Sequence, residues 1–315
     1  MEKAKGERIV LRTADLEVTF KGAEAWPFSE RFAGAGVVEQ VVLHKKHRFC
    51  QPEQKLPGRV TCHGQGLCSE FVWDQLAGEA AEGQFFPKIG VGLLRQRPEG
   101  GAYDMWKHYE TEAFPTEVYV SGNRVIYRQK PRSCLDIAVE LTRTAEVYRN
   151  IITIVTKLKN VGKRTVTPEE YHHNFVAIDD YPVGPGYQLE IPFDGTLAEL
   201  EESTVRIGDY RTPVKEVIKT SGQTVFWKKQ MTGTACHKVT EENRILDCPQ
   251  YWWRLSHQDS PAAVEEHVNF VPSGLVVWGI EHCICPEVYG RWHVEPGKEK
   301  VMVRTWRFED DKTAK

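Results

Sequence analysis

Apolar and polar residues alternate one by one along much of this 315-residue chain, and this period of two constrains its fold more than any other feature. The alternation is clear over 135–142, over 152–158 and again over 300–308. Successive side chains of a β-strand point to opposite faces, so the pattern is typical of strands with one buried face. The 25 glycines and 17 prolines are spread between these segments and are not gathered in a linker. The sequence therefore predicts many strands and no domain boundary.

The expected elements are strands and hairpins, with few helices. Residues 117–120 and 124–128 flank Ser121-Gly122-Asn123, which indicates a hairpin with a three-residue loop. The apolar segment 275–285 is expected to be one strand. Ser69 could cap a short helix over 70–77, and 196–202 could form another turn or two. The predicted fold class is all-β, with one large antiparallel domain over 1–315.

Composition excludes several classes of protein. The 41 Lys and Arg nearly balance the 44 Asp and Glu, giving a formal net charge of -3, so no nucleic-acid or anionic-membrane partner is expected. No stretch approaches the 18 apolar residues of a transmembrane helix, and the first 20 residues contain no apolar core of a signal peptide. The eight cysteines are scattered, which favours reduced thiols in a cytoplasmic protein over a disulfide scaffold.

The densest polar cluster is Glu169-Glu170-Tyr171-His172-His173-Asn174-Phe175. On a strand, Tyr171, His173 and Phe175 share one face, and His172 and Asn174 share the other. An imidazole beside an aromatic ring on an inward face could act as a general acid or base near neutral pH. The alternative is that both histidines are solvated, or hydrogen-bonded within the core.

A second candidate segment is Trp278–Glu287. A carboxylate such as Glu281 within an apolar strand must be exposed, paired or functional, because burying it unpaired is costly. His282, Cys283 and Cys285 could contribute to a zinc site, but no second Cys or His pair follows at ligand spacing. No metal site is therefore predicted.

Other segments supply candidate ligand contacts. His63 lies beside two glycines, Gly64 and Gly66, which permit close approach of backbone to a ligand, although a plain turn would also explain them. Two cations on the glycine-rich segment 86–95 could bind an oxygen-rich ligand or could be rim charges. An aromatic cluster at 106–109 could stack on a sugar ring or fill the space between two sheets. These segments and the polar cluster at 169–175 together supply the candidate substrate-binding residues His63, Lys88, Arg95, His108 and Asn174.

Three segments together resemble the galactose mutarotase-like superfamily, which contains the aldose 1-epimerases. Residues 281–287, Glu-His-Cys-Ile-Cys-Pro-Glu, are similar to that family's Glu-Thr-Gln-x-x-Pro-Asp strand. Residues 171–175 resemble the strand that carries the family's Asn-His-x-x-Phe histidine, and residues 294–298 with 301–308 resemble its Pro-Gly-Glu turn and final strand. The resemblance implies a β-supersandwich of large antiparallel sheets.

The resemblance also implies a reaction, the interconversion of the α and β anomers of an aldose or sugar acid without metal, nucleotide or other cofactor. Glu281 would be the base that takes the anomeric hydroxyl proton, and a histidine would protonate the ring oxygen. His172 has the family's three-residue offset to Phe175, whereas His173 lies in the His-Asn-Phe pattern of divergent relatives. We favour His173 because it shares a face with Phe175.

The chain departs from the family pattern at two places. Cys283 stands where mutarotases have Gln, and no Asn-Arg-Ile precedes Cys62. A noncatalytic carbohydrate-binding or sensing protein on the same fold is therefore the alternative function. A lyase or hydrolase on a related β-supersandwich is a third, which the absence of a signal peptide disfavours. In each case the expected partner is a small-molecule carbohydrate.

Overall fold

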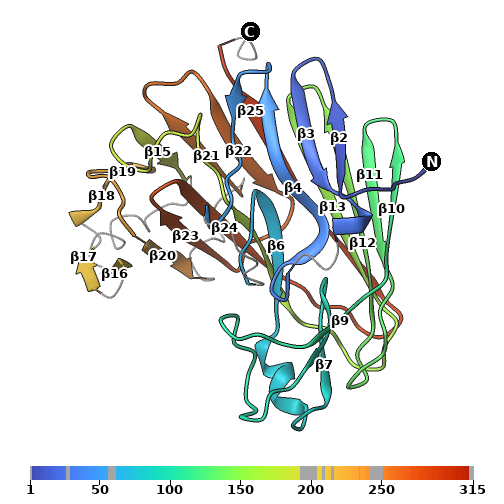
Figure 1. The fold of residues 1–315 in the computed structure, drawn as a ribbon. Coiled ribbons are helices and arrows are strands. Elements are labelled where there is room, and N and C mark those ends of the chain that lie inside the picture. The colour runs from blue at the N-terminus through green and yellow to red at the C-terminus, as the bar shows by residue number, and fades with distance from the viewer. Residues whose placement is uncertain are drawn as a thin grey trace.

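The alternating side chains build two large antiparallel sheets that lie face to face (Figure 1). The structure is a computed structural model, and it describes residues 2–25, 29–55, 62–191, 204–207, 210–213, 216–233, 235–241 and 251–311. The helical turn expected over 196–202 lies outside these residues. The all-β fold class predicted from the alternation is confirmed.

The first sheet has eleven strands in the order β1-β10-β11-β12-β13-β25-β22-β21-β15-β19-β18. The last strand of the chain, β25, therefore lies in its interior, between β13 and β22. The bounds are β1 Glu2–Lys3, β10 Thr116–Ser121, β11 Arg124–Gln129, β12 Val139–Tyr148, β13 Ile151–Asn160, β15 Tyr187–Glu190, β18 Ile218–Ser221, β19 Thr224–Trp227, β21 Tyr251–His257, β22 Ala263–Val268 and β25 Glu299–Glu309.

The second sheet has the order β2-β3-β4-β6-β14-β24-β23-β20, with β5 paired to β4. Its strands are β2 Arg8–Arg12, β3 Leu16–Lys21, β4 Ala33–Leu43, β5 His47–Arg48, β6 Leu67–Val72, β14 Glu169–Asn174, β20 Ala235–Glu241, β23 Gly274–Ile280 and β24 Cys283–Arg291. A small three-stranded sheet consists of β7 Phe85–Lys88, β8 Gly92–Arg95 and β9 Thr111–Ala113, and a two-stranded sheet consists of β16 Thr204–Ile207 and β17 Tyr210–Pro213. The 3-10 turns are η1 Ala23–Ala25 and η2 Asp74–Glu79.

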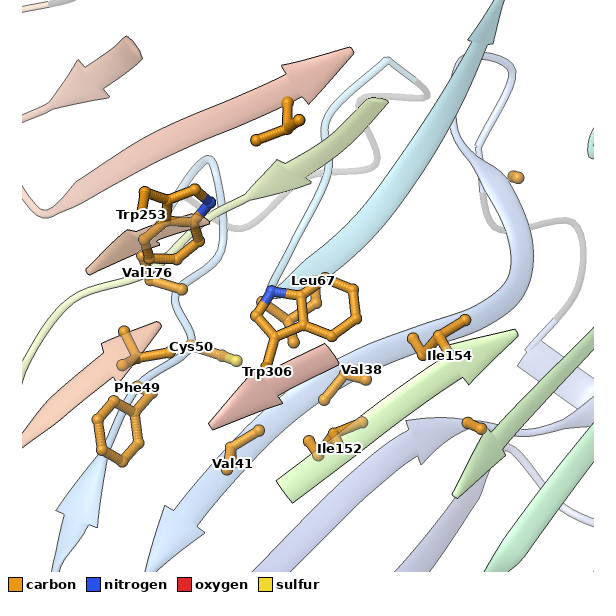
Figure 2. Close-up of a cluster of buried hydrophobic side chains, with 14 of the residues drawn as sticks. Val38, Val41, Phe49, Cys50, Leu67, Ile152, Ile154, Val176, Trp253 and Trp306 are labelled. Atoms are coloured by element: carbon orange, nitrogen blue, oxygen red, sulfur yellow. The ribbon is translucent and has the colours of Figure 1, made fainter. Parts of the chain in front are cut away.

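The apolar core fills the space between the two large sheets. Figure 2 shows two of its indoles, Trp253 of β21 and Trp306 of β25, among aliphatic side chains from both sheets. Both indoles are fully buried. Burial of aromatic side chains contributes about 2–3 kcal/mol each to a core of this kind.

A buried ionic cluster also lies between the sheets. Arg143 of β12 contacts Glu170 of β14 at 3.2 Å, and Arg304 of β25 contacts the same carboxylate at 3.1 Å. Arg304 also contacts Glu266 of β22 at 2.9 Å. Two arginines and two glutamates balance in charge, which is what charges removed from water require.

The structure corrects four local expectations. The apolar segment 275–285 is a hairpin and not one strand, because Ile280 pairs with Cys283 and the chain turns between them. The helix expected over 70–77 is instead the end of β6 followed by the 3-10 turn η2. Ser121 pairs with Arg124, so the loop between β10 and β11 has two residues. The strand expected over 135–142 begins only at Val139.

Among the described residues, the only helices are these short 3-10 turns, and none is long and apolar enough to cross a membrane.

Candidate functional site

The outer face of the second sheet, which points away from the core, gathers polar and aromatic side chains from four neighbouring strands. Alternation along β14 places Tyr171 and His173 on the face opposite to His172 and Asn174, as the sequence predicts. It is His172 and Asn174 that point into the core, whereas the His173 face, considered as an inward one, points outward. The strands beside β14 are β6 and β24, and β23 follows β24. Their outward residues are Cys68 and Glu70 of β6, Cys283, Cys285, Glu287 and Tyr289 of β24, and Trp278 and Ile280 of β23.

His173 is paired with Glu287 on this face. Its Nε2 atom lies 3.0 Å from Glu287 Oε1, and both residues are buried. Phe175 stacks on the imidazole with ring centroids 3.9 Å apart, and Trp278 meets it edge-on. The Nδ1 atom is buried without a hydrogen bond among the described residues.

Burial keeps this pair neutral. It raises the pKa of Glu287 to about 8, although the nearby charge of Arg31 opposes the shift. Burial, with Arg31 again nearby, also lowers the pKa of His173 well below its usual range. Removing both groups from water disfavours the charged form of each, so at pH 7 a carboxylic acid lies against a neutral imidazole.

Arg31 is the centre of a second buried network on the same face. Its Nε donates to Glu70 at 2.7 Å and its Nη2 to the Tyr171 hydroxyl at 2.8 Å. Lys88 Nζ donates to the other oxygen of Glu70 at 3.0 Å. Burial alone would raise the pKa of Glu70, but Lys88 and Arg31 hold it at about 2. Two cations on one carboxylate leave this network with a positive charge.

A hollow of about 610 Å³ opens beside these networks, within the size range of small-molecule sites. Sheet residues, the β23–β24 turn and two loops form its wall. The lining residues are Glu53, Gln54, Lys55, His63, Trp106, Trp278, Ile280, Glu281 and His282. Trp278 joins the hollow to the buried pair, because its indole lines the former and contacts His173 of the latter.

The structure brings two sequence-predicted residues, His63 and Glu281, to this hollow. His63 is half-buried, and burial together with the charge of Arg31 lowers its pKa. The glycine after it, Gly64, is required by the sheet beneath: a Cβ there would come within 2.5 Å of Phe175. The close approach predicted for this glycine is therefore to the protein's own aromatic side chain.

Glu281 lies in the turn between β23 and β24 and not within a strand. Its side chain is 58% exposed and lies 3.7 Å from His282. Glu287 lies six positions further along the chain, which corresponds to about 20 Å on an extended strand. The carboxyl group against His173 is thus that of Glu287, and the structure shows no contact between Glu281 and that imidazole.

His172 and Asn174 belong to the core and not to the hollow. Asn174 donates to Glu266 at 3.0 Å and to the Pro286 carbonyl, and it accepts a hydrogen bond from the Trp306 indole. His172 is fully buried, and burial with two neighbouring arginines lowers its pKa well below the usual range. Neither side chain is available to a ligand on the outer face.

Three other predicted contacts have protein partners instead. Lys88 is buried against Glu70, and Arg95 forms a pair with Glu110 on the surface at 2.7 Å. His108 is exposed and contacts Glu30 at 2.7 Å. None of the three lines the hollow.

The described residues include most of the cysteines and the three residues considered for a zinc site. Six of the cysteines are free thiols, namely Cys50, Cys62, Cys68, Cys134, Cys283 and Cys285. Within the described ranges, no group of three or more His, Cys, Asp or Glu residues could hold a metal ion. His282 contacts the Pro52 carbonyl at 2.8 Å. Cys283 and Cys285 are buried in an apolar cluster with Phe32 and Phe175 on the outer face of the second sheet.

Sequence reasoning missed Arg31, Glu53 and the role of Glu287 in the pair. Glu287 had a signal, since it is the second acid of the 281–287 motif and β24 alternation places it with Cys283 and Cys285. Arg31 and Glu53 lie outside regular motifs, in segments that reach the site only through tertiary packing.

The fold is that of known galactose mutarotase-like proteins. A structure from Synechocystis sp. PCC 6803 superposes with a TM-score of 0.58 at 12% identity, covering 98% of each chain. A galactose mutarotase related enzyme from Lactobacillus acidophilus gives 0.55 at 12%, covering 96% of this chain and 97% of that one. A galactose mutarotase-like protein from Clostridium acetobutylicum gives 0.56 at 9%, covering 98% of each. No protein-family model and no curated protein matches the sequence. The predicted superfamily resemblance is confirmed at the level of the fold.

Proposed function

We propose that this protein binds a carbohydrate in the hollow and interconverts its anomers by general acid–base catalysis. The observation that carries the proposal is the meeting of Glu281 and His63 in one hollow, although they lie in motifs more than two hundred residues apart. Trp278 and Trp106 add two indole surfaces to the same wall, and such surfaces can stack on the C–H face of a sugar ring. The structures with this fold include proteins described as mutarotase-related, which supports the same substrate class.

Anomeric exchange needs a base at the anomeric hydroxyl and an acid at the ring oxygen. Glu281 is the proposed base because its carboxylate is accessible at the rim of the hollow. His173, which the sequence favours as the acid, is separated from the hollow by Trp278. The variant His173→Asn tests whether this imidazole supplies the acid.

The test is saturation-transfer NMR of anomeric exchange over a panel of free sugars, sugar acids and sugar phosphates. For a sugar that the wild type exchanges, Glu281→Gln should reduce the rate by about 100-fold or more, because it keeps the shape and removes the base. Sugar binding should survive. Glu295→Gln, in another exposed turn, is the matched control and should exchange at the wild-type rate. Full exchange by Glu281→Gln would contradict the proposed base.

Binding without turnover is the second candidate function. The specific observation in its favour is the burial of His173, which is 2% exposed and does not line the hollow. If the wild type binds a sugar of the panel and exchanges none, this second function holds and the enzymatic one fails.

A further inference from the structure

Glu53 brings a mostly buried carboxyl group to the wall of the hollow. It is 7% exposed and is tied to the loop that carries His63 by two hydrogen bonds. The Glu53 backbone N–H donates to the Gly64 carbonyl at 3.0 Å, and the Gly64 N–H donates to Glu53 Oε2 at 2.7 Å. This reciprocal link fixes the position of the carboxyl group relative to the hollow.

The second oxygen of Glu53 has no partner in the part of the chain that the structure describes. Among the described residues, Glu53 Oε1 takes part in no hydrogen bond or ion pair. It is also absent from the fully buried polar atoms that have no hydrogen-bond partner. Since Glu53 lines the hollow, its carboxyl group is within reach of a ligand bound there.

The two carboxyl groups of the hollow have different surroundings. Burial raises the pKa of Glu53, although the Gly64 N–H and the charge of Arg31 oppose the shift. Glu53 therefore keeps its proton to a higher pH than a free glutamic acid does. Glu281 is exposed in its turn. A buried acid and an exposed carboxylate in one cavity form the arrangement that general acid–base catalysis uses.

We infer that Glu53 is the catalytic acid that protonates the ring oxygen of the bound sugar. This inference rests on the proposed function. The Glu53 proton passes to the ring oxygen, and the bond between that oxygen and the anomeric carbon breaks. Glu281 takes the proton of the anomeric hydroxyl, whose electron pair forms the aldehyde C=O. After rotation about the C1–C2 bond, the reverse transfers close the other anomer and restore both carboxyl groups.

The histidines near the hollow are less suited to donate this proton. His63 lines the hollow, but burial and the charge of Arg31 lower its pKa, so its imidazole is neutral at pH 7. A neutral imidazole is a far weaker acid than a carboxylic acid. His173 lies behind Trp278, with its Nε2 against Glu287.

The experiment compares Glu53→Gln with Glu53→Asp, His173→Asn and Glu39→Gln in the NMR exchange assay across pH. Glu53→Gln keeps an oxygen that accepts the Gly64 N–H but has no acidic proton. We expect its exchange rate to fall by about 100-fold or more, and Glu53→Asp to recover part of the rate. The side chain of Glu39 in β4 is 6% exposed and pairs with Arg8 and Lys21. Glu39 does not line the hollow, so Glu39→Gln should keep the wild-type rate.

The pH profile separates a catalytic role from a structural one. In the wild type the rate should fall as the pH rises past the pKa of Glu53, because the acid loses its proton. In Glu53→Gln this alkaline limb should disappear from the residual activity. Wild-type rates in Glu53→Gln, or a loss confined to His173→Asn, would overturn the inference while the proposed function stands. A wild type that exchanges no sugar of the panel would overturn both.

Discussion

At the scale of residues, the His173–Glu287 pair makes stability depend on pH. The pKa of Glu287 is about 8 in the folded protein and near 4.5 in the unfolded chain, so between these values the folded state binds more protons. The contribution of Glu287 to stability therefore falls as the pH rises through this window, whereas His173, whose pKa is lowered from 6.5, acts in the opposite direction at the acid end of it. Between pH 7 and 8, urea unfolding should show the wild type losing about 1 kcal/mol more than Glu287→Gln. Parallel pH dependences of the two proteins would contradict the raised pKa.

The candidate site was predictable from the sequence only in part, and the reason is physical. Alternation assigns each residue of a strand to a face, and it separated His173 from His172 correctly. It does not say where a strand turns, so Glu281 was expected inside one. It also says nothing of which loop folds over the sheet, and Glu53 reaches the hollow by such a loop.

At the scale of elements, the buried ionic cluster joins strands of both sheets through Arg304. Replacing this arginine with Met would leave the Glu170 and Glu266 carboxylates buried without their shared partner. We expect Arg304→Met to reduce the free energy of unfolding by about 3–5 kcal/mol. Arg95→Met, which removes an exposed pair with Glu110, should cost much less, because water screens an exposed ion pair. Urea unfolding measures both, and equal losses would show that the cluster adds nothing beyond a surface pair.

The long elements were predictable where one face is buried and the other is solvated. Strands β13 and β25 alternate in burial as their sequences do, so the period of two located both. The segment before Val139 alternates equally well but forms a turn, with Leu135 and Asp136 at positive φ. The turn is closed locally by two hydrogen bonds between the backbones of Cys134 and Ile137. Alternation of apolar and polar side chains does not detect it, because the turn depends on positive φ at two residues that are not glycine.

At the scale of the whole molecule, the sheet order makes the two chain ends unequal. Strand β25 pairs with β13 over 151–159 and with β22 over 263–268, so removing it would divide the eleven-stranded sheet and expose two long unpaired edges. Strand β1 is an edge strand of two exposed residues that pairs with β10 alone. Deleting residues 299–315 should therefore abolish the cooperative urea transition and the near-ultraviolet circular dichroism of the packed tryptophans. Deleting residues 1–3 should change the free energy of unfolding by about 0.5 kcal/mol or less. A cooperative transition at the wild-type midpoint after the first deletion would show that the two halves of the sheet hold together without β25.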